Sequence, residues 1–241
     1  MNPGYASLCF LSFNRPKTLR EGIHSALDNA GYPCEIVVHD DGSLYEVQRE
    51  LLDMLTDGLI SSLVLEPCGH NEGVGRSINR AFAVATGDPV CKLDQDLTFE
   101  SDWLKKAVTI VEEDDRLGML GLFKYHVEPV RWQDMELKPG WSARHGIPYH
   151  YVKDFVGSAM IIPRDHLAYF GVFPEHSDAF AEDVEYKLLM QKHGYSLGLP
   201  DEDLATNRGF GVGPSTVVTG FTDGVGQVQP IHHGPRVFNV S

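Results

Sequence analysis

Residues 89–97 read Pro-Val-Cys-Lys-Leu-Asp-Gln-Asp-Leu, an apolar run that ends in two aspartates separated by one residue. In an extended chain, residues two apart point to the same side, so Asp94 and Asp96 are predicted to project together from a strand end. Paired carboxylates suit Mg²⁺ or Mn²⁺, above all when substrate phosphates supply the other ligands. The same pattern occurs in turns and calcium loops, so the metal site depends on support from neighbouring segments.

Strand-like and helix-like segments alternate over the first hundred residues. The strand-like segments are apolar runs, and the helix-like segments carry apolar residues at helical spacing. The predicted strands are 6–13, 35–39, 62–65 and 89–93, and the predicted helices begin near 16, near 47 and at 71–76. This alternation predicts an α/β fold with a mostly parallel central sheet that is flanked by helices on both faces.

The pattern is looser after residue 100. Helices are predicted at 103–111, after Pro163 and at 181–193, and strands at 119–125 and 156–162. Residues 126–153 are polar and aromatic with Pro and Gly, and they are predicted to form a long loop or a hairpin.

The composition limits the possible function. The chain has 241 residues, which suits one large α/β domain, and its net charge of −14 disfavours nucleic acid and anionic membranes. No apolar run reaches the roughly 20 residues that span a bilayer, and no signal peptide is recognised at the N-terminus. The four cysteines lack metal-site spacing and are predicted to be free thiols, so the cytoplasm is the expected compartment.

Polar side chains follow the predicted strands or open the next helix. They are Asn14, Asp40, Asp41, Asn71, Asp94 and Asp96. Ligands of open parallel sheets bind at the carboxyl ends of the strands. The sequence therefore predicts a ligand site at this edge.

Several motifs follow one another in a fixed order. They are Ser12-Phe13-Asn14-Arg15-Pro16, Asp40-Asp41-Gly42-Ser43, Asn71-Glu72-Gly73, the Asp94 and Asp96 pair, Gly157-Ser158, Glu182-Asp183 and Gly194-Tyr195. Together they resemble the nucleotide-sugar-dependent glycosyltransferases of family 2. The resemblance implies a single Rossmann-like GT-A domain over 1–241, with a nucleotide-binding half at 1–98 and an acceptor-binding half with a C-terminal extension at 99–241.

The resemblance also assigns roles in the donor site. Asp41 matches the aspartate that hydrogen-bonds the nucleobase, and a carboxylate can accept from the N3–H of uracil. Asp94 is expected to hold the ribose or the metal and Asp96 to be the principal metal contact, with His232, or else His233, as a further ligand. Ordinary alternatives remain: residues 40–43 simply turn the chain and cap the following helix, with Ser43 as the cap, and the histidines lie at the surface.

Other residues are expected to complete the donor site. They are Ser12, Asn14, Arg15, Asn71, Gly73, Arg76 and Gly157. The segment with Asn71 and Gly73 is predicted to begin a helix, and the backbone N–H groups there can face a ribose or phosphate. Arg76 either adds positive charge near the diphosphate or is a solvent-facing helix residue, and Gly157 lets a sugar approach the backbone closely.

The acidic pair Glu182-Asp183 is the expected catalytic group. In inverting members of the family the aspartate takes the proton of the acceptor hydroxyl, which makes Asp183 the general base. The alternative is that both acids favour a helix N-terminus through its dipole. A retaining mechanism also stays open.

These assignments predict transfer of a sugar from a nucleotide-sugar donor, UDP-linked, to a hydroxyl of a carbohydrate, lipid-linked, protein or small-molecule acceptor. The competing hypotheses are a sugar-nucleotide nucleotidyltransferase and a non-catalytic sugar-nucleotide-binding protein. Four aromatic residues fit an acceptor platform or lid, a cover over the core or a dimer contact. They are Trp132, Trp141, Tyr149 and Tyr151.

Overall fold

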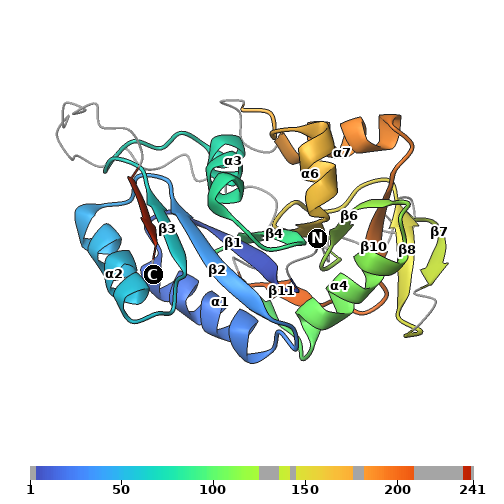
Figure 1. Ribbon diagram of the computed structural model, residues 1–241, viewed down its shortest axis with the longest axis horizontal. Coiled ribbons are helices and arrows are strands. Elements are labelled where there is room, and N and C mark those ends of the chain that lie inside the picture. The colour runs from blue at the N-terminus through green and yellow to red at the C-terminus, as the bar shows by residue number, and fades with distance from the viewer. Residues whose placement is uncertain (1–3, 125–135, 142–144, 176–181, 209–235, 240–241) are drawn as a thin grey trace.

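The computed structural model describes residues 4–124, 136–141, 145–175, 182–208 and 236–239 (Figure 1). The strands of its large sheet are β1 (Ala6–Ser12), β2 (Cys34–Asp40), β3 (Ser62–Leu65), β4 (Val90–Asp94), β6 (Leu117–Gly121), β7 (Glu136–Trp141), β8 (Pro148–Val152), β9 (Ala159–Ile162), β10 (Ser196–Pro200) and β12 (Arg236–Asn239). A second, two-stranded sheet pairs β5 (Leu97–Phe99) with β11 (Ala205–Asn207). The helices are α1 (Pro16–Asp28), α2 (Tyr45–Thr56), α3 (Val74–Val84), α4 (Trp103–Glu113), α6 (Arg164–Phe170) and α7 (Glu182–Lys192).

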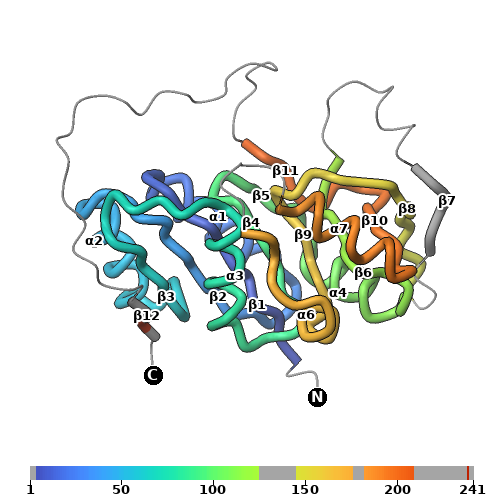
Figure 2. The backbone as a smooth tube through the Cα atoms, turned by 90° about the horizontal axis from the view of Figure 1, so that it is seen from above, coloured from blue at the N-terminus to red at the C-terminus, as the bar shows by residue number. Residues whose placement is uncertain are grey.

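The large sheet has the strand order β12-β3-β2-β1-β4-β9-β6-β10-β8-β7, and Figure 2 shows β3 and β8 toward its opposite ends. The neighbours β3, β2, β1 and β4 are parallel, as the alternation of segments predicted. Beyond β4 the sheet is mixed, because β9 runs antiparallel to both β4 and β6, and β8 runs antiparallel to β10. The carboxyl ends of four adjacent parallel strands therefore meet at one edge.

Helices cover both faces of the sheet (Figure 1). One core contains side chains of α1, α2 and α4, and two smaller clusters contain side chains of α3, α6 and α7. The strands between them are apolar on both sides, with Leu8 and Phe10 in the first core and Cys9 in one of the smaller clusters. This two-sided burial explains why the strands lack polar alternation in the sequence.

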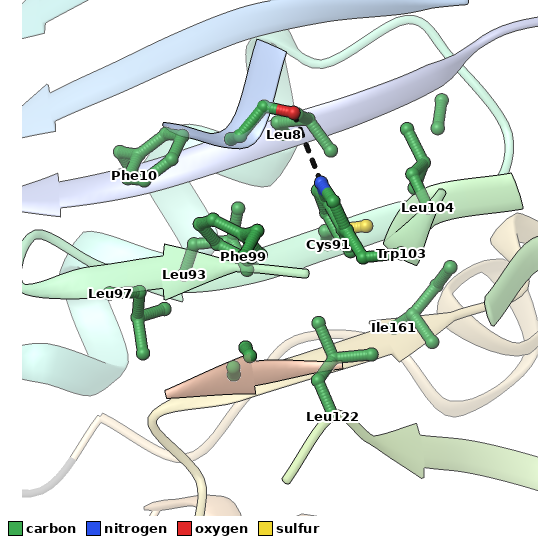
Figure 3. Close-up of a cluster of buried hydrophobic side chains, with 14 of the residues drawn as sticks. Leu8, Phe10, Cys91, Leu93, Leu97, Phe99, Trp103, Leu104, Leu122 and Ile161 are labelled. Carbon is green, nitrogen blue, oxygen red and sulfur yellow. Dashed lines mark hydrogen bonds between the residues drawn. The ribbon is translucent and has the colours of Figure 1, made fainter. Parts of the chain in front are cut away.

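Trp103 anchors α4 in the larger core (Figure 3). Its side chain is fully buried, its indole N–H donates to the carbonyl oxygen of Ala26 over 3.0 Å, and its ring centroid lies 4.4 Å from that of Phe99. Leu93 of β4 and Leu97 of β5 belong to the same cluster, so the chain on both sides of the acidic pair is held by apolar packing.

The predicted excursion at 126–153 contains a hairpin, because β7 pairs with β8 and β8 joins the large sheet beside β10. Tyr149 and Tyr151 are buried, and both hydroxyls donate to Oδ2 of Asp114, the first over 2.5 Å. These two tyrosines therefore cover the core, and the platform hypothesis is wrong for them. Trp132 and the side chain of Trp141 lie outside the described residues.

Two further expectations concern the chain as a whole. All four cysteines are free, with Cys9 and Cys91 buried and Cys34 and Cys68 half-buried. None of the helices in the described ranges is both long and apolar enough to cross a bilayer. The expected compartment stays a prediction.

Asp114 gives a test of the hairpin's attachment. Burial alone would raise the pKa of this carboxyl, but hydrogen bonds from Arg116, Tyr149 and Tyr151 outweigh burial and lower the pKa to about 2. Asp114→Ala removes the acceptor that the two buried hydroxyls share, and the 3.5 Å contact between the hydroxyls can satisfy only one of them, so we expect urea titration to show a loss of about 3 kcal/mol in unfolding free energy at pH 7.

The pH dependence of that loss has a defined sign. Because the folded pKa lies below the unfolded value of about 3.9, the stabilisation is present at neutral pH and declines as pH falls from about 5 toward 2. The neighbouring exposed Asp115→Ala is the control and should change stability by less than about 0.5 kcal/mol. Equal losses for both variants would contradict this role of Asp114.

Candidate active site at the carboxyl edge of the sheet

Asn14 joins the loops after β1 and β2. It has a left-handed backbone with φ of 54°, its N–H donates to Oγ of Ser43 over 2.8 Å, and its Oδ1 accepts from the N–H of Leu44 over 3.0 Å. Leu44 is the residue that precedes α2, so Asn14 rather than Ser43 binds a free amide at that helix start. Asp40 is fully buried and accepts from both the N–H and the hydroxyl of Ser43.

Asp41 connects this turn to the loop before α3. Its carboxylate oxygens accept from the N–H groups of Glu72 (2.8 Å) and Gly73 (3.0 Å). Burial raises the pKa of Asp41, and these two hydrogen bonds oppose the rise. Each carboxylate oxygen has a second lone pair, so the expected contact with a nucleobase is compatible with this geometry and stays a prediction. Asn71, in the same loop before α3, is exposed.

Arg76 lies on the first turns of α3 and pairs with two carboxylates. Its guanidinium lies 2.8 Å from Glu72 and 3.1 Å from Glu175, and its side chain is 40% exposed. In the structure the Arg76 guanidinium forms ion pairs with these two carboxylates. Its expected position near a diphosphate stays a prediction.

The acidic pair does not have the extended geometry predicted from its spacing. Asp94 ends β4, whereas Gln95 and Asp96 form the turn into β5. The Gln95 side chain holds this turn against the loop after β1, since its amide exchanges two hydrogen bonds of 3.2 Å with the main chain of Phe13. Burial first, and then the negative charge of the neighbouring Asp94, raise the pKa of the Asp96 carboxyl. A guanidinium nitrogen of Arg15 lies 3.5 Å from Oδ2 of Asp96.

Lys92 joins the acidic pair to the second half of the chain. It is buried, and its Nζ lies 2.5 Å from Oδ1 of Asp94 and 2.7 Å from the carbonyl oxygen of Gly157. The N–H of Asp94 donates to the carbonyl oxygen of Ser158 over 2.9 Å. A methyl group added at Gly157 would overlap Oδ2 of Asp183, so α7 begins directly against this segment.

Glu182 and Asp183 are both buried at the start of α7. The carboxylate of Asp183 lies 3.0 Å from Nζ of Lys187. Glu182 packs against α3, since a methyl group added at Gly75 would come within 3.3 Å of its Cβ. The structure therefore brings Asp183 near Asp94, and it places Glu182 toward α3.

Of the remaining residues predicted for the site, the structure describes Ser12 but neither of the two histidines. Ser12 is buried at the end of β1, and within the described ranges its Oγ has no hydrogen-bond partner. His232 and His233 lie outside the described residues. No group of three or more His, Cys, Asp or Glu side chains that could hold a metal occurs in the described part of the chain, so Asp94 and Asp96 stand as a pair there.

Three side chains that organise this site, namely Lys92, Gln95 and Lys187, do not belong to the site predicted from the sequence motifs. Two of them carried a positional signal. Lys92 stands two residues before Asp94 in a strand, and Lys187 stands four residues after Asp183 in a helix, so each shares a face with its carboxylate.

The family model of Glycosyl transferase family 2 matches residues 7–170. The chain belongs to glycosyltransferase family 2. The match runs from β1 to α6, so it contains the acidic pair and Gly157, whereas Asp183 lies beyond it.

Two curated relatives match part of the chain. A glucosyl-dolichyl phosphate glucuronosyltransferase of Haloferax volcanii is 31% identical over 107 residues, which is 44% of this chain and 33% of that protein. An uncharacterized glycosyltransferase of Nostoc sp. is 29% identical over 115 residues, 47% of this chain and 35% of the relative. The matched segment spans about a third of each relative's length.

Solved structures confirm the predicted GT-A fold class. The mannosyltransferase PcManGT from Pyrobaculum calidifontis, in complex with GDP-Man and Mn²⁺, has a TM-score of 0.62 at 19% identity, over 87% of this chain and 59% of that chain. GalNAc-T7 with UDP, GalNAc and Mn²⁺ has a TM-score of 0.64 at 18% identity, over 81% and 42% of the two chains. At these identities the likeness establishes the fold.

The buried contacts of Lys92 predict that its removal destabilises the protein. Breaking a fully buried ion pair costs about 3–5 kcal/mol. Because the Asp94 side chain is 34% exposed, we expect Lys92→Met to lower the unfolding free energy by about 2–3 kcal/mol in urea titrations.

Arg208→Met is the matched control for Lys92→Met. Arg208 pairs with Glu21 across a surface where the two side chains are 51% and 65% exposed, so we expect a loss below about 1 kcal/mol. A Lys92→Met variant as stable as Arg208→Met would show that Lys92 does not hold the two halves of the site together.

Proposed function

We propose that this chain is a metal-dependent inverting glycosyltransferase that transfers a sugar from a UDP-sugar to an acceptor hydroxyl, with Asp183 as the general base. One observation carries the proposal. The end of β4 with its acidic pair, the Gly157-Ser158 segment and the start of α7 with Asp183 lie in contact at one edge of the sheet. Such a site needs a donor-binding group and a base within reach of one another.

The acidic pair fits a divalent cation. Asp94 and Asp96 are both oxygen donors, they repel one another, and the positive groups beside them, Lys92 and Arg15, each contact one of the two carboxylates. These two carboxylates would hold Mn²⁺ or Mg²⁺ together with donor phosphates. When bound, the ion supplies positive charge that stabilises the departing nucleoside diphosphate. The Mn²⁺ complexes of the two solved structures support this assignment.

The nucleotide is assigned through Asp41. Its carboxylate is fixed by two backbone N–H groups, so its free lone pairs have a defined direction. A fixed carboxylate can accept the N3–H of uracil, which favours UDP. Guanine also presents ring N–H and amino donors, and one similar structure contains GDP-Man, so GDP is the nucleotide to compare.

The acceptor belongs to one of four classes: a carbohydrate, a lipid-linked sugar, a protein or a small molecule. The name of the Haloferax relative supports the lipid-linked class. This chain spans 33% of that relative, so the acceptor is best identified by direct assay.

The base assignment predicts a defined loss of turnover. Asp183→Asn keeps the shape of the side chain but removes its basicity, and a positioned general base contributes about 10²–10⁴-fold to the rate. We expect transfer, or hydrolysis of the donor by water, to fall by about this factor while UDP affinity stays unchanged. Steady-state kinetics and calorimetry measure the two quantities.

Glu185→Gln is the control for Asp183→Asn, because it removes one carboxylate from an exposed position of the same helix. It should keep normal turnover. Full activity of Asp183→Asn would refute the base assignment, and donor binding without any turnover of the wild type would support a non-catalytic binding protein.

The metal assignment predicts nucleotide binding that needs both the ion and Asp96. In calorimetric titrations, UDP should bind the wild type with Mn²⁺ present and lose at least about 10-fold in affinity with EDTA. Asp96→Ala should bind UDP weakly under both conditions, because one of the two oxygen-donor side chains is gone. GDP is titrated in parallel, and tighter binding of GDP than of UDP would correct the nucleotide.

Asp115→Ala removes an exposed aspartate that follows α4 and serves as the control in these titrations. UDP binding that is equally tight in Mn²⁺ and EDTA, or in wild type and Asp96→Ala, would contradict the metal site.

A further inference from the structure

Lys187 is a buried cation on α7, one helical turn after Asp183, with a side chain that is 3% exposed. Its Nζ lies 3.0 Å from Oδ2 of Asp183 and 2.5 Å from the carbonyl oxygen of Phe155, and it also pairs with Asp154. An ammonium group has three N–H donors, and these three acceptors engage all of them. Lys187 therefore has no N–H left to donate to a ligand, and Asp183 is the one of its three partners to which a chemical role is assigned.

The two carboxylate oxygens of Asp183 have different surroundings. Oδ2 lies between Lys187 and Gly157, where even an added methyl group would overlap it. For Oδ1, no hydrogen bond or ion pair is recorded within the described ranges. Among the described residues, Oδ2 is thus the oxygen that the protein holds, and Oδ1 keeps its lone pairs for another partner.

We propose that Lys187 is a positioning residue that holds Oδ2 of Asp183 and so makes Oδ1 the oxygen that receives the acceptor proton. The inference rests on the proposed function, in which Asp183 is the base. In this step the acceptor O–H bond breaks and the proton moves to Oδ1 while the acceptor oxygen bonds to the anomeric carbon. The bond from that carbon to the diphosphate oxygen breaks, and its electron pair leaves with the nucleoside diphosphate.

The effect of losing Lys187 follows from this arrangement. Without the ammonium group, the Asp183 carboxylate can rotate away from the acceptor, and a misplacement of about 1 Å costs on the order of 10²-fold in rate. The residues assigned to nucleotide binding, Asp41 and Asp96, lie on other elements and keep their contacts. We therefore expect a fall in kcat with little change in nucleotide affinity.

The test compares Lys187→Met with Lys192→Met, which removes an exposed lysine from the same helix. Release of UDP or GDP is followed with water as the acceptor, from UDP-glucose, UDP-galactose, UDP-N-acetylglucosamine, UDP-glucuronic acid and GDP-mannose. Both substitutions are also made in the Asp183→Asn background. Thermal unfolding and calorimetry with UDP and Mn²⁺ show that each variant is folded and binds nucleotide.

We expect Lys187→Met to lower kcat by about 10–100-fold with KM and UDP affinity within about 2-fold, and Lys192→Met to match the wild type. In the Asp183→Asn background, Lys187→Met should lower the residual rate no further, because its effect passes through the carboxylate. If Lys187→Met does not fold, Lys187→Gln replaces it under the same comparisons.

Two results would overturn the inference. One is a Lys187→Met enzyme with a kcat within about 2-fold of wild type, and the other is an equal fold loss in both backgrounds. A wild-type protein that releases no UDP or GDP from any of the five donors would instead count against the proposed function, so the two failures are distinguishable.

Discussion

The Lys92 ammonium group joins the two halves of the sheet at the point where the site lies. β4 is parallel to β1 on one side and antiparallel to β9 on the other, so the sheet changes its pattern at this strand. Lys92 bonds Asp94 on its own strand and the carbonyl oxygen of Gly157 on the segment before β9. A charge buried this deeply is tolerated only with such partners, and these partners set the position of the acidic pair relative to α7.

The same principle recurs at the other carboxylates of this edge. Asp40 is held by Ser43, Asp41 by the backbone of Glu72 and Gly73, and Asp183 by Lys187. Each buried acid is therefore fixed by donors from its own surroundings before any ligand arrives. Fixed groups need little reorganisation when charge develops near them, which is the property that the proposed sugar transfer from a charged donor demands.

Most of the fold could be predicted from the sequence because it depends on local periodicity. Apolar runs such as 62–65 read directly as strands buried on both faces, and the first four strands formed the predicted parallel set. The positions of Asp41 and Asp94 at strand ends also followed from this reading. The antiparallel pairing of β9 with β4 and of β8 with β10 could not be predicted in this way, because pairing depends on which distant segments meet.

The sequence by itself determined the first four strands of the large sheet with the helices between them, the family and the edge at which the polar residues gather, since these depend on residue type and spacing. Only the tertiary structure decided that Asp96 lies in a turn and that the buried Tyr149 hydroxyl donates to Asp114. It also decided that Oδ2 of Asp183 lies between Lys187 and Gly157. Spacing tells which face of a strand or helix a side chain occupies. It does not tell what packs against that face, because the deciding contacts join residues as far apart as Lys92 and Gly157, 65 positions along the chain.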